Sequence, residues 1–160
     1  MYKSNYKVYC DMDGVIADFY GYMRQRSQTY RLTRKFEDKE IPIGAFAELN
    51  TMPDADVLMN FLKKHFGSNL FILTAIPSRA IDPNIRRDKK QWVKKHFNIT
   101  EDKVYTVARH QKRYFANGPK TILIDDLNQN IDEWKDAGGT GILFKNALQC
   151  IDELKEILGE

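Results

Sequence analysis

Short apolar runs alternate with amphipathic stretches along this chain. The apolar runs have the length and composition of buried strands. They are residues 6–10, 69–73, 103–107, 121–124 and 141–144. Between them, apolar residues recur at helical spacing. These stretches are residues 53–66, 82–97, 128–137 and 146–158. Such an alternation predicts an α/β fold with a doubly wound parallel sheet of five strands.

The helix expected from residue 82 carries a group of basic side chains. Asp82 is predicted as its N-cap and Pro83 as its first residue. The basic residues are assigned to a solvated outer face, which could also attract an anionic substrate. They are Arg86, Arg87, Lys89, Lys90, Lys94 and Lys95.

The segment from about residue 19 to residue 52 interrupts the alternation, because it contains no strand pattern. Residues 16–30 have helical spacing, and the rest, through Pro42 and Gly44, is expected to be irregular. We expect a single domain, residues 1–160, with this segment inserted after the first strand as a small helical cap. Core packing explains most of its aromatic residues and solvation explains its arginines. Rings beside cations also suit a flat, negatively charged ligand.

Composition narrows the class of protein. The net charge of +3 comes from 25 basic and 22 acidic residues, which is no strong signal for nucleic-acid binding but is compatible with small anionic substrates. Cys10 and Cys150 are the only cysteines, so no disulfide framework is expected. We therefore expect the protein in a reducing cytoplasm. No apolar run has membrane-spanning length, and residues 1–7 lack an apolar signal core. The sequence leaves a homodimer open.

Three predicted strands end in side chains with functional chemistry. These are Asp11 and Asp13, then Thr74, and then Asp125 with Asp126. Alone, the first pair would be read as a turn with a helix cap, and Asp126 as a cap. A calcium loop is excluded, because the twelfth position counted from Asp11 is Tyr22 rather than glutamate. Parallel strands bring their carboxyl ends to one edge, where α/β sheets bind ligands, so the groups together predict a site.

This combination resembles the motifs of the haloacid dehalogenase (HAD) phosphatase superfamily. Residues 11–15 resemble its first motif, Leu73 with Thr74 its second, and residues 123–126 its fourth. Its third motif is a lysine, for which Lys112 is our choice. Lys120 competes, but it directly precedes the fourth strand and so is expected at the opposite end of the sheet. Within the superfamily, residues 11–19 and the tail from residue 124 to residue 144 resemble the 5′(3′)-deoxyribonucleotidase family.

The resemblance implies a phosphomonoesterase that depends on Mg²⁺ and forms an aspartyl-phosphate intermediate. Asp11 would be the nucleophile and Asp13 the general acid and base. The implied phosphate-binding residues are Thr74, Ala75 and Lys112, although Ala75 departs from the serine of some members. The implied metal ligands are Asp11, Asp13 through its main-chain carbonyl, and Asp126, supported by Asp125. Phe19, Tyr20 and Arg79 are the candidates for holding the nucleoside. The expected partner is a small phosphomonoester, a deoxynucleotide.

Two alternatives stay open at this point. One is a HAD phosphatase with another substrate, such as a sugar phosphate or a polynucleotide 3′-phosphate. The small net charge gives the polynucleotide little support, and the aromatic cap favours a nucleotide over a sugar phosphate. The other is a catalytically inactive module that binds a nucleotide or a phosphoprotein. A pure binder has no need for the nucleophile, so the presence of Asp11 together with the other motif residues argues against it.

Overall fold

A computed structural model of the chain describes residues 5–160. Residues 1–4, part of the stretch in which no signal core was expected, lie outside the described residues. Five parallel strands form one sheet in the order β3-β2-β1-β4-β5. The strands are β1 (Lys7–Cys10), β2 (Leu70–Ala75), β3 (Val104–Val107), β4 (Thr121–Asp125) and β5 (Thr140–Leu143). The predicted α/β fold with a doubly wound sheet is confirmed.

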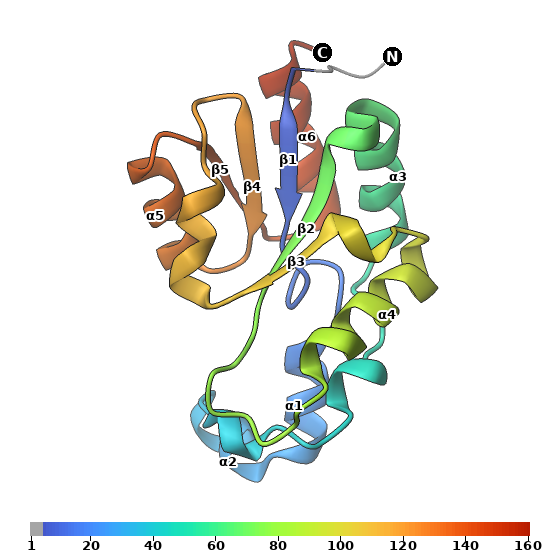
Figure 1. Cartoon of the computed structure of the whole chain (residues 1–160), viewed down its shortest axis with the longest axis vertical. Coiled ribbons are helices and arrows are strands. Elements are labelled where there is room, and N and C mark those ends of the chain that lie inside the picture. The colour runs from blue at the N-terminus through green and yellow to red at the C-terminus, as the bar shows by residue number, and fades with distance from the viewer. Residues whose placement is uncertain (1–4) are drawn as a thin grey trace.

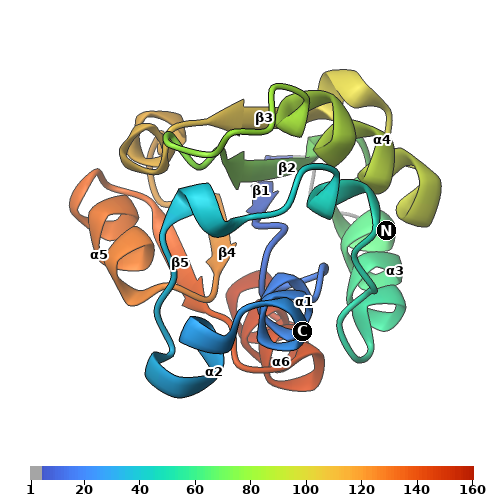
Figure 2. The ribbon, with the colours of Figure 1, turned by 90° about the horizontal axis from the view of Figure 1, so that it is seen from below.

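Helices cover both faces of this sheet (Figures 1 and 2). The α-helices are α1 (Phe19–Arg26), α2 (Gln28–Thr33), α3 (Ala55–Phe66), α4 (Ile85–Phe97), α5 (Asn128–Asp136) and α6 (Ala147–Leu158). Short 3₁₀ turns are Asp38–Glu40, Ala45–Ala47, Gly67–Asn69, Glu101–Lys103 and Arg109–Phe115. Within residues 5–160, no helix combines the length and the apolar character that crossing a membrane requires.

The central strand shows why two cores form. Side chains alternate across a strand, so Val8 and Cys10 face the core shared with α3, α4 and α6. Tyr9 faces the other side, where it packs with Trp134 of α5 and stacks on Phe71 at a centroid distance of 5.1 Å. Burial on both faces is typical of a parallel strand and fixes the register. Cys10 therefore pairs with both neighbouring strands, and Asp11 emerges at a defined position beyond them.

The cap segment, residues 19–52, lies beyond the carboxyl ends of the strands, with α1 and α2 at the bottom of Figure 1. Its two connections to the core run side by side. Asp18 N donates to Asn50 O at 2.8 Å, and Met52 N donates to Ile16 O at 2.9 Å. Trp92 of α4 adds a hydrogen bond from Nε1 to Leu49 O at 2.8 Å. These contacts place the cap opposite the strand ends that carry the candidate site.

Local structure departs from the sequence prediction in two places near the cap. The helix expected over residues 16–30 is broken at Ser27, whose hydroxyl caps α2 by accepting from Tyr30 N at 3.1 Å. Helix α4 begins at Ile85 with Asn84 as its N-cap, so the predictions of Asp82 as N-cap and Pro83 as first helical residue are wrong. The buried Asp82 carboxylate instead accepts from Gly44 N of the cap at 2.8 Å and from Asn84 N at 2.9 Å. Asp82 thus links the cap to the loop before α4.

Candidate active site

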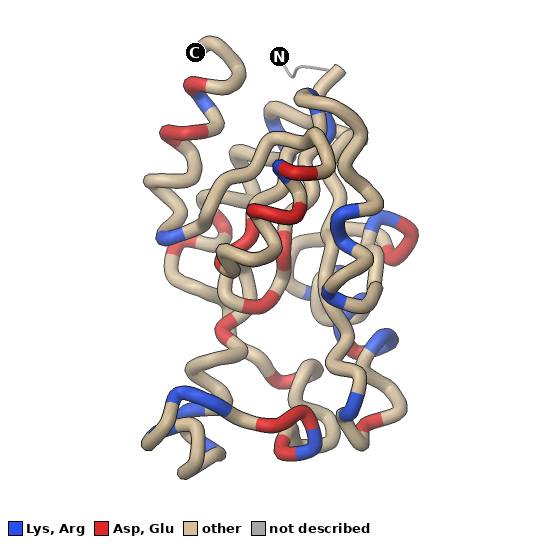
Figure 3. Tube along the Cα trace, turned by 90° about the vertical axis from the view of Figure 1, so that its left-hand side faces the viewer, with Lys and Arg blue, Asp and Glu red and all other residues tan. Residues whose placement is uncertain are grey.

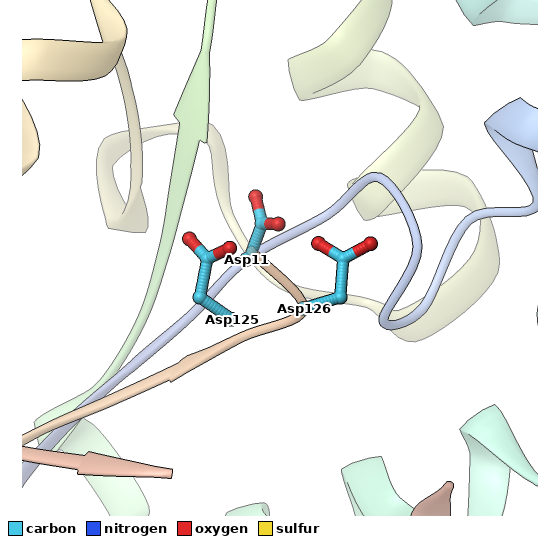
Figure 4. Close-up of side chains that lie close together, drawn as sticks. All are labelled: Asp11, Asp125 and Asp126. Atoms are coloured by element: carbon cyan, nitrogen blue, oxygen red, sulfur yellow. The ribbon is translucent and has the colours of Figure 1, made fainter. Parts of the chain in front are cut away.

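Three carboxylates meet where β1 and β4 end. Asp11 follows β1, Asp125 ends β4 and Asp126 follows it, and each offers an oxygen within 4.8 Å of the others. Figure 4 shows the three side chains next to one another and pointing to the same side. Asp11 and Asp125 are buried, so their charges are poorly screened. Such a cluster requires positive charge nearby.

Lys112 supplies one of these charges from the 3₁₀ segment Arg109–Phe115. Its Nζ lies 2.9 Å from Asp11 Oδ1 and 2.8 Å from Asp125 Oδ2, and its side chain is 3% exposed. Burial alone would lower the pKa of Lys112, but the two carboxylates outweigh burial and raise it above its usual range. The competing Lys120 lies over the Tyr6 ring, before β4 and away from the cluster.

The single positive charge of Lys112 does not neutralise the three carboxylates of the cluster. Burial first, and then the Asp125 carboxylate, raise the pKa of Asp11 well above its usual range and that of Asp126 to about 6. Both oxygens of Asp125 already accept hydrogen bonds from the protein. Leu127 N donates to Oδ1 at 3.0 Å, and Lys112 and Asn130 donate to Oδ2. Asp11 and Asp126 therefore have oxygens left that could hold a metal ion, and an oxygen-only set with excess negative charge fits a hard divalent cation.

Gly14 explains how the loop after β1 closes against this cluster. Its φ of +84° lies in the left-handed region that favours glycine. A Cβ at this position would lie 2.0 Å from Asp126 Oδ2 and 3.0 Å from the Tyr20 ring. Glycine is required here for both conformation and space, and it lets the chain around Asp13 approach Asp126.

Asp13 and Thr74 are joined by a residue that the sequence analysis had assigned to solvent. Lys89 of α4 is fully buried, and its Nζ donates to Asp13 Oδ2 at 2.9 Å and to Thr74 Oγ1 at 2.8 Å. The prediction of an exposed Lys89 is wrong. Its spacing was an available signal, because Lys89 is four residues after Ile85 and three before Trp92, both of which face the core.

A cavity of about 490 Å³ lies between the carboxylates and the cap. Its polar floor includes Asp11, Asp13, Lys112, Asp125 and Asp126. Its cap side is aromatic and apolar, formed by Phe19, Tyr20, Phe36, Ile41 and Phe46. The rings of Phe19 and Phe46 stack at a centroid distance of 5.0 Å. The cavity thus combines acidic and basic groups at one end with flat apolar surfaces at the other.

The predicted binding residues differ in their relation to this cavity. Phe19, Tyr20 and Ala75 line it. Thr74 is fully buried, is not among the residues that line the cavity, and accepts a hydrogen bond from Lys89. Arg79 is not brought to the site, because it is exposed, does not line the cavity, and uses its main-chain N to donate to Asp38 Oδ2 at 3.2 Å. Asp38 does line the cavity, and no feature of the sequence marked it.

Solved structures share this architecture. A hydrolase from Streptococcus pneumoniae TIGR4 has a TM-score of 0.54 at 9% identity, over 98% of this chain and 100% of that chain. A HAD-superfamily hydrolase from Ehrlichia chaffeensis has a TM-score of 0.53 at 11% identity, over 99% of each chain. No protein-family model and no curated protein sequence matches the chain. At these identities the likeness concerns the fold, and the fold is that of HAD-type hydrolases.

Proposed function

We propose that this protein is a phosphomonoesterase that depends on Mg²⁺ and acts on (deoxy)nucleoside monophosphates. The observation that carries the proposal is the contact of Lys112 with Asp11 and Asp125 at the floor of a cavity whose cap side is aromatic. The resemblance of residues 11–19 to the 5′(3′)-deoxyribonucleotidases points to the same substrate class.

Asp11 would attack phosphorus. A carboxylate is a nucleophile that needs no general base at neutral pH. One Asp11 oxygen would form the new bond to phosphorus while the ester P–O bond breaks. Asp13 would give its proton to the leaving oxygen. In the second half, Asp13 takes a proton from water, the water oxygen bonds to phosphorus, and the bond between Asp11 and phosphorus breaks.

The residues that would hold Mg²⁺ are Asp11, the Asp13 main-chain carbonyl and Asp126, with Asp125 in support. A magnesium ion bound there supplies charge that offsets the repulsion between the phosphate and the carboxylates. The chain's own contribution is to hold the phosphate. Lys112 supplies positive charge next to Asp11, and Thr74 has a hydroxyl hydrogen to donate.

The cap supports a nucleoside rather than a sugar as the esterified group. Aromatic side chains stack on flat heterocycles, and such contacts contribute about 1–3 kcal/mol per base. Phe19, Tyr20 and Phe46 offer such surfaces. Figure 3 shows both acidic and basic positions along core and cap, and the net charge is only +3, which gives little support to a polynucleotide substrate.

The test is an assay of phosphate release from 5′- and 3′-(deoxy)nucleoside monophosphates and sugar phosphates, with Mg²⁺ or with a chelator. We expect release from deoxynucleotides that requires Mg²⁺. Asp11→Asn should lower it by about a thousandfold or more. Asp152→Asn, the same change at an exposed position of α6, is the matched control and should behave as wild type.

Mass spectrometry of acid-quenched enzyme should find the phosphoryl group on Asp11. Equal phosphate release by the wild type and by Asp11→Asn would show that the assignment of Asp11 as the nucleophile is wrong. No release from any substrate would favour the binding-module alternative. Release from sugar phosphates alone would retain the chemistry and refute the nucleotide assignment.

A further inference from the structure

Lys89 of α4 has its whole hydrogen-bonding capacity in use behind the site. Its side chain is 0% exposed, and its ammonium donates to Asp13 Oδ2, to Thr74 Oγ1 and, at 2.7 Å, to the Ala75 carbonyl oxygen. An ammonium has three N–H donors, so none remains for a ligand. Lys89 can therefore influence a reaction only through the groups it holds.

The first of these groups is the Thr74 hydroxyl. A hydroxyl can both accept and donate a hydrogen bond, whereas an ammonium only donates. The oxygen of Thr74 must therefore be the acceptor in its bond with Lys89. The hydrogen of the Thr74 hydroxyl takes no part in this bond, so Lys89 makes Thr74 a hydrogen-bond donor.

The second group is the Asp13 carboxylate. Lys89 holds Oδ2, while Oδ1 is buried and has no hydrogen-bond partner among residues 5–160. An unpartnered buried oxygen is costly and calls for a functional reason. Held by one oxygen, the carboxylate keeps a fixed orientation and leaves the other oxygen to exchange a proton.

The enclosure of Lys89 is completed from the cap, where the Phe46 ring lies 4.5 Å from Nζ in a cation–π contact. A buried ammonium is energetically costly unless every donor is satisfied. A structural role alone would be filled better by an apolar residue of the same size. Lys89 instead contacts Asp13 and Thr74, the two groups that the phosphatase reaction would need to orient.

We infer that Lys89 is a positioning residue, which aims Oδ1 of Asp13 at the leaving oxygen and presents the Thr74 hydroxyl to the phosphate. The inference rests on the proposed function. It predicts that loss of Lys89 harms the reaction most where the leaving group needs a proton. A nucleoside leaves as a strongly basic alkoxide, whereas para-nitrophenolate leaves without protonation.

The experiment compares kcat/KM for a deoxynucleoside monophosphate and for para-nitrophenyl phosphate, with Mg²⁺ present. This ratio covers the steps up to formation of the phosphoryl-enzyme, so hydrolysis of that intermediate does not enter. Lys89→Met should lose about a hundredfold on the nucleotide and about tenfold or less on the aryl ester. Lys94→Met, an exposed lysine of the same helix, should match wild type on both.

An equal loss on both substrates, in a variant with the wild-type circular dichroism spectrum, would overturn the inference. If Lys89→Met does not fold, Lys89→Gln keeps an amide donor without the charge and is read by the same substrate ratio. In an Asp13→Asn background, Lys89→Met should not further change the kcat/KM on the nucleotide relative to that on the aryl ester. An additional loss on the nucleotide alone would also contradict the positioning role of Lys89. A wild-type enzyme inactive on every phosphoester would refute the proposed function itself.

Discussion

Replacing Lys112 with methionine is the sharpest test of how the acidic cluster is held. The substitution keeps most of the side-chain volume and removes the charge. In the wild type, the ammonium lies within 2.9 Å of both Asp11 and Asp125, and only 3% of the side chain is exposed. The variant leaves these two carboxylates without their cation, beside Asp126.

The magnitude follows from burial. Removing one partner of a buried ion pair costs about 3–5 kcal/mol, because the other charge stays behind without compensation. In a chain of this size, each kcal/mol lowers the melting temperature by about 2–4 °C. Lys112→Met should therefore melt about 6–20 °C below wild type in the presence of a chelator. Added Mg²⁺ should recover part of the loss, because a bound cation offsets the same carboxylates.

Thermal unfolding and urea unfolding, both followed by circular dichroism with chelator and with Mg²⁺, measure the melting temperature and the free energy of unfolding. Lys120→Met is the matched control, since Lys120 is exposed and lies at the other end of β4. Its free energy of unfolding should stay within about 0.5 kcal/mol of wild type. Equal stability of the two variants would refute the argument that Lys112 holds the cluster together. A Lys112 variant that Mg²⁺ does not rescue would show that the cluster is not where the metal binds.

The remaining predictions concern the metal, the loop after β1, a helix cap and the thiols. Asp126→Asn should abolish the rise in melting temperature that Mg²⁺ produces in wild type, as measured by thermal shift, and a preserved rise would exclude Asp126 as a ligand. Gly14→Ala should destabilise the fold and weaken that Mg²⁺ response, whereas Gly118→Ala, with the same φ of +84° but open space at its Cβ, should only destabilise. Asn146→Ala removes the cap that accepts from Gln149 N at 2.9 Å and should cost about 1 kcal/mol in urea unfolding. Burial raises the pKa of the Cys150 thiol to about 12, so a thiol reagent at pH 8 should not react with it in the native protein, and rapid modification would contradict this.

The sheet could be predicted because its strands are apolar on both faces. Ile122, Leu123 and Ile124 of β4 are all fully buried, and such a run has few alternatives in a chain with helices on either side. The break at Ser27 could not be predicted, since residues 16–30 carry helical spacing throughout. Ser27 ends one helix and caps the next only where the surrounding cap packs against it, and the local sequence does not encode that packing.

The convergence of Asp11, Thr74 and Asp125 near one edge follows from the topology alone. Parallel strands of one sheet end on the same side, so functional residues that directly follow them must lie near one another. Lys89 could not be placed in the same way. Its helical spacing predicts a buried side chain, whereas its charge predicts an exposed one. Only the contact with Asp13, 76 residues earlier in the chain, shows that the side chain is buried. A lysine on a buried helix face becomes interpretable once its acidic partner is known.

The two buried lysines pair with different carboxylates of the site, and the charges that stay unpaired suggest where a metal ion would bind. Lys112 serves Asp11 and Asp125, and Lys89 serves Asp13. Counting Asp126, four carboxylates face two ammonium groups, an excess of two negative charges that one divalent cation would balance. Arg109 does not alter this count, because its guanidinium is paired with Glu133 at 3.2 Å. Asp126 is the carboxylate without a lysine partner among these four. Burial first, and then the neighbouring Asp125 carboxylate, raise the pKa of both Asp126 and Asp11. In the proposed reaction the two lysines would orient the reacting groups, and the negative charge that they leave uncompensated, at Asp11 and Asp126, is where the proposed cation would bind.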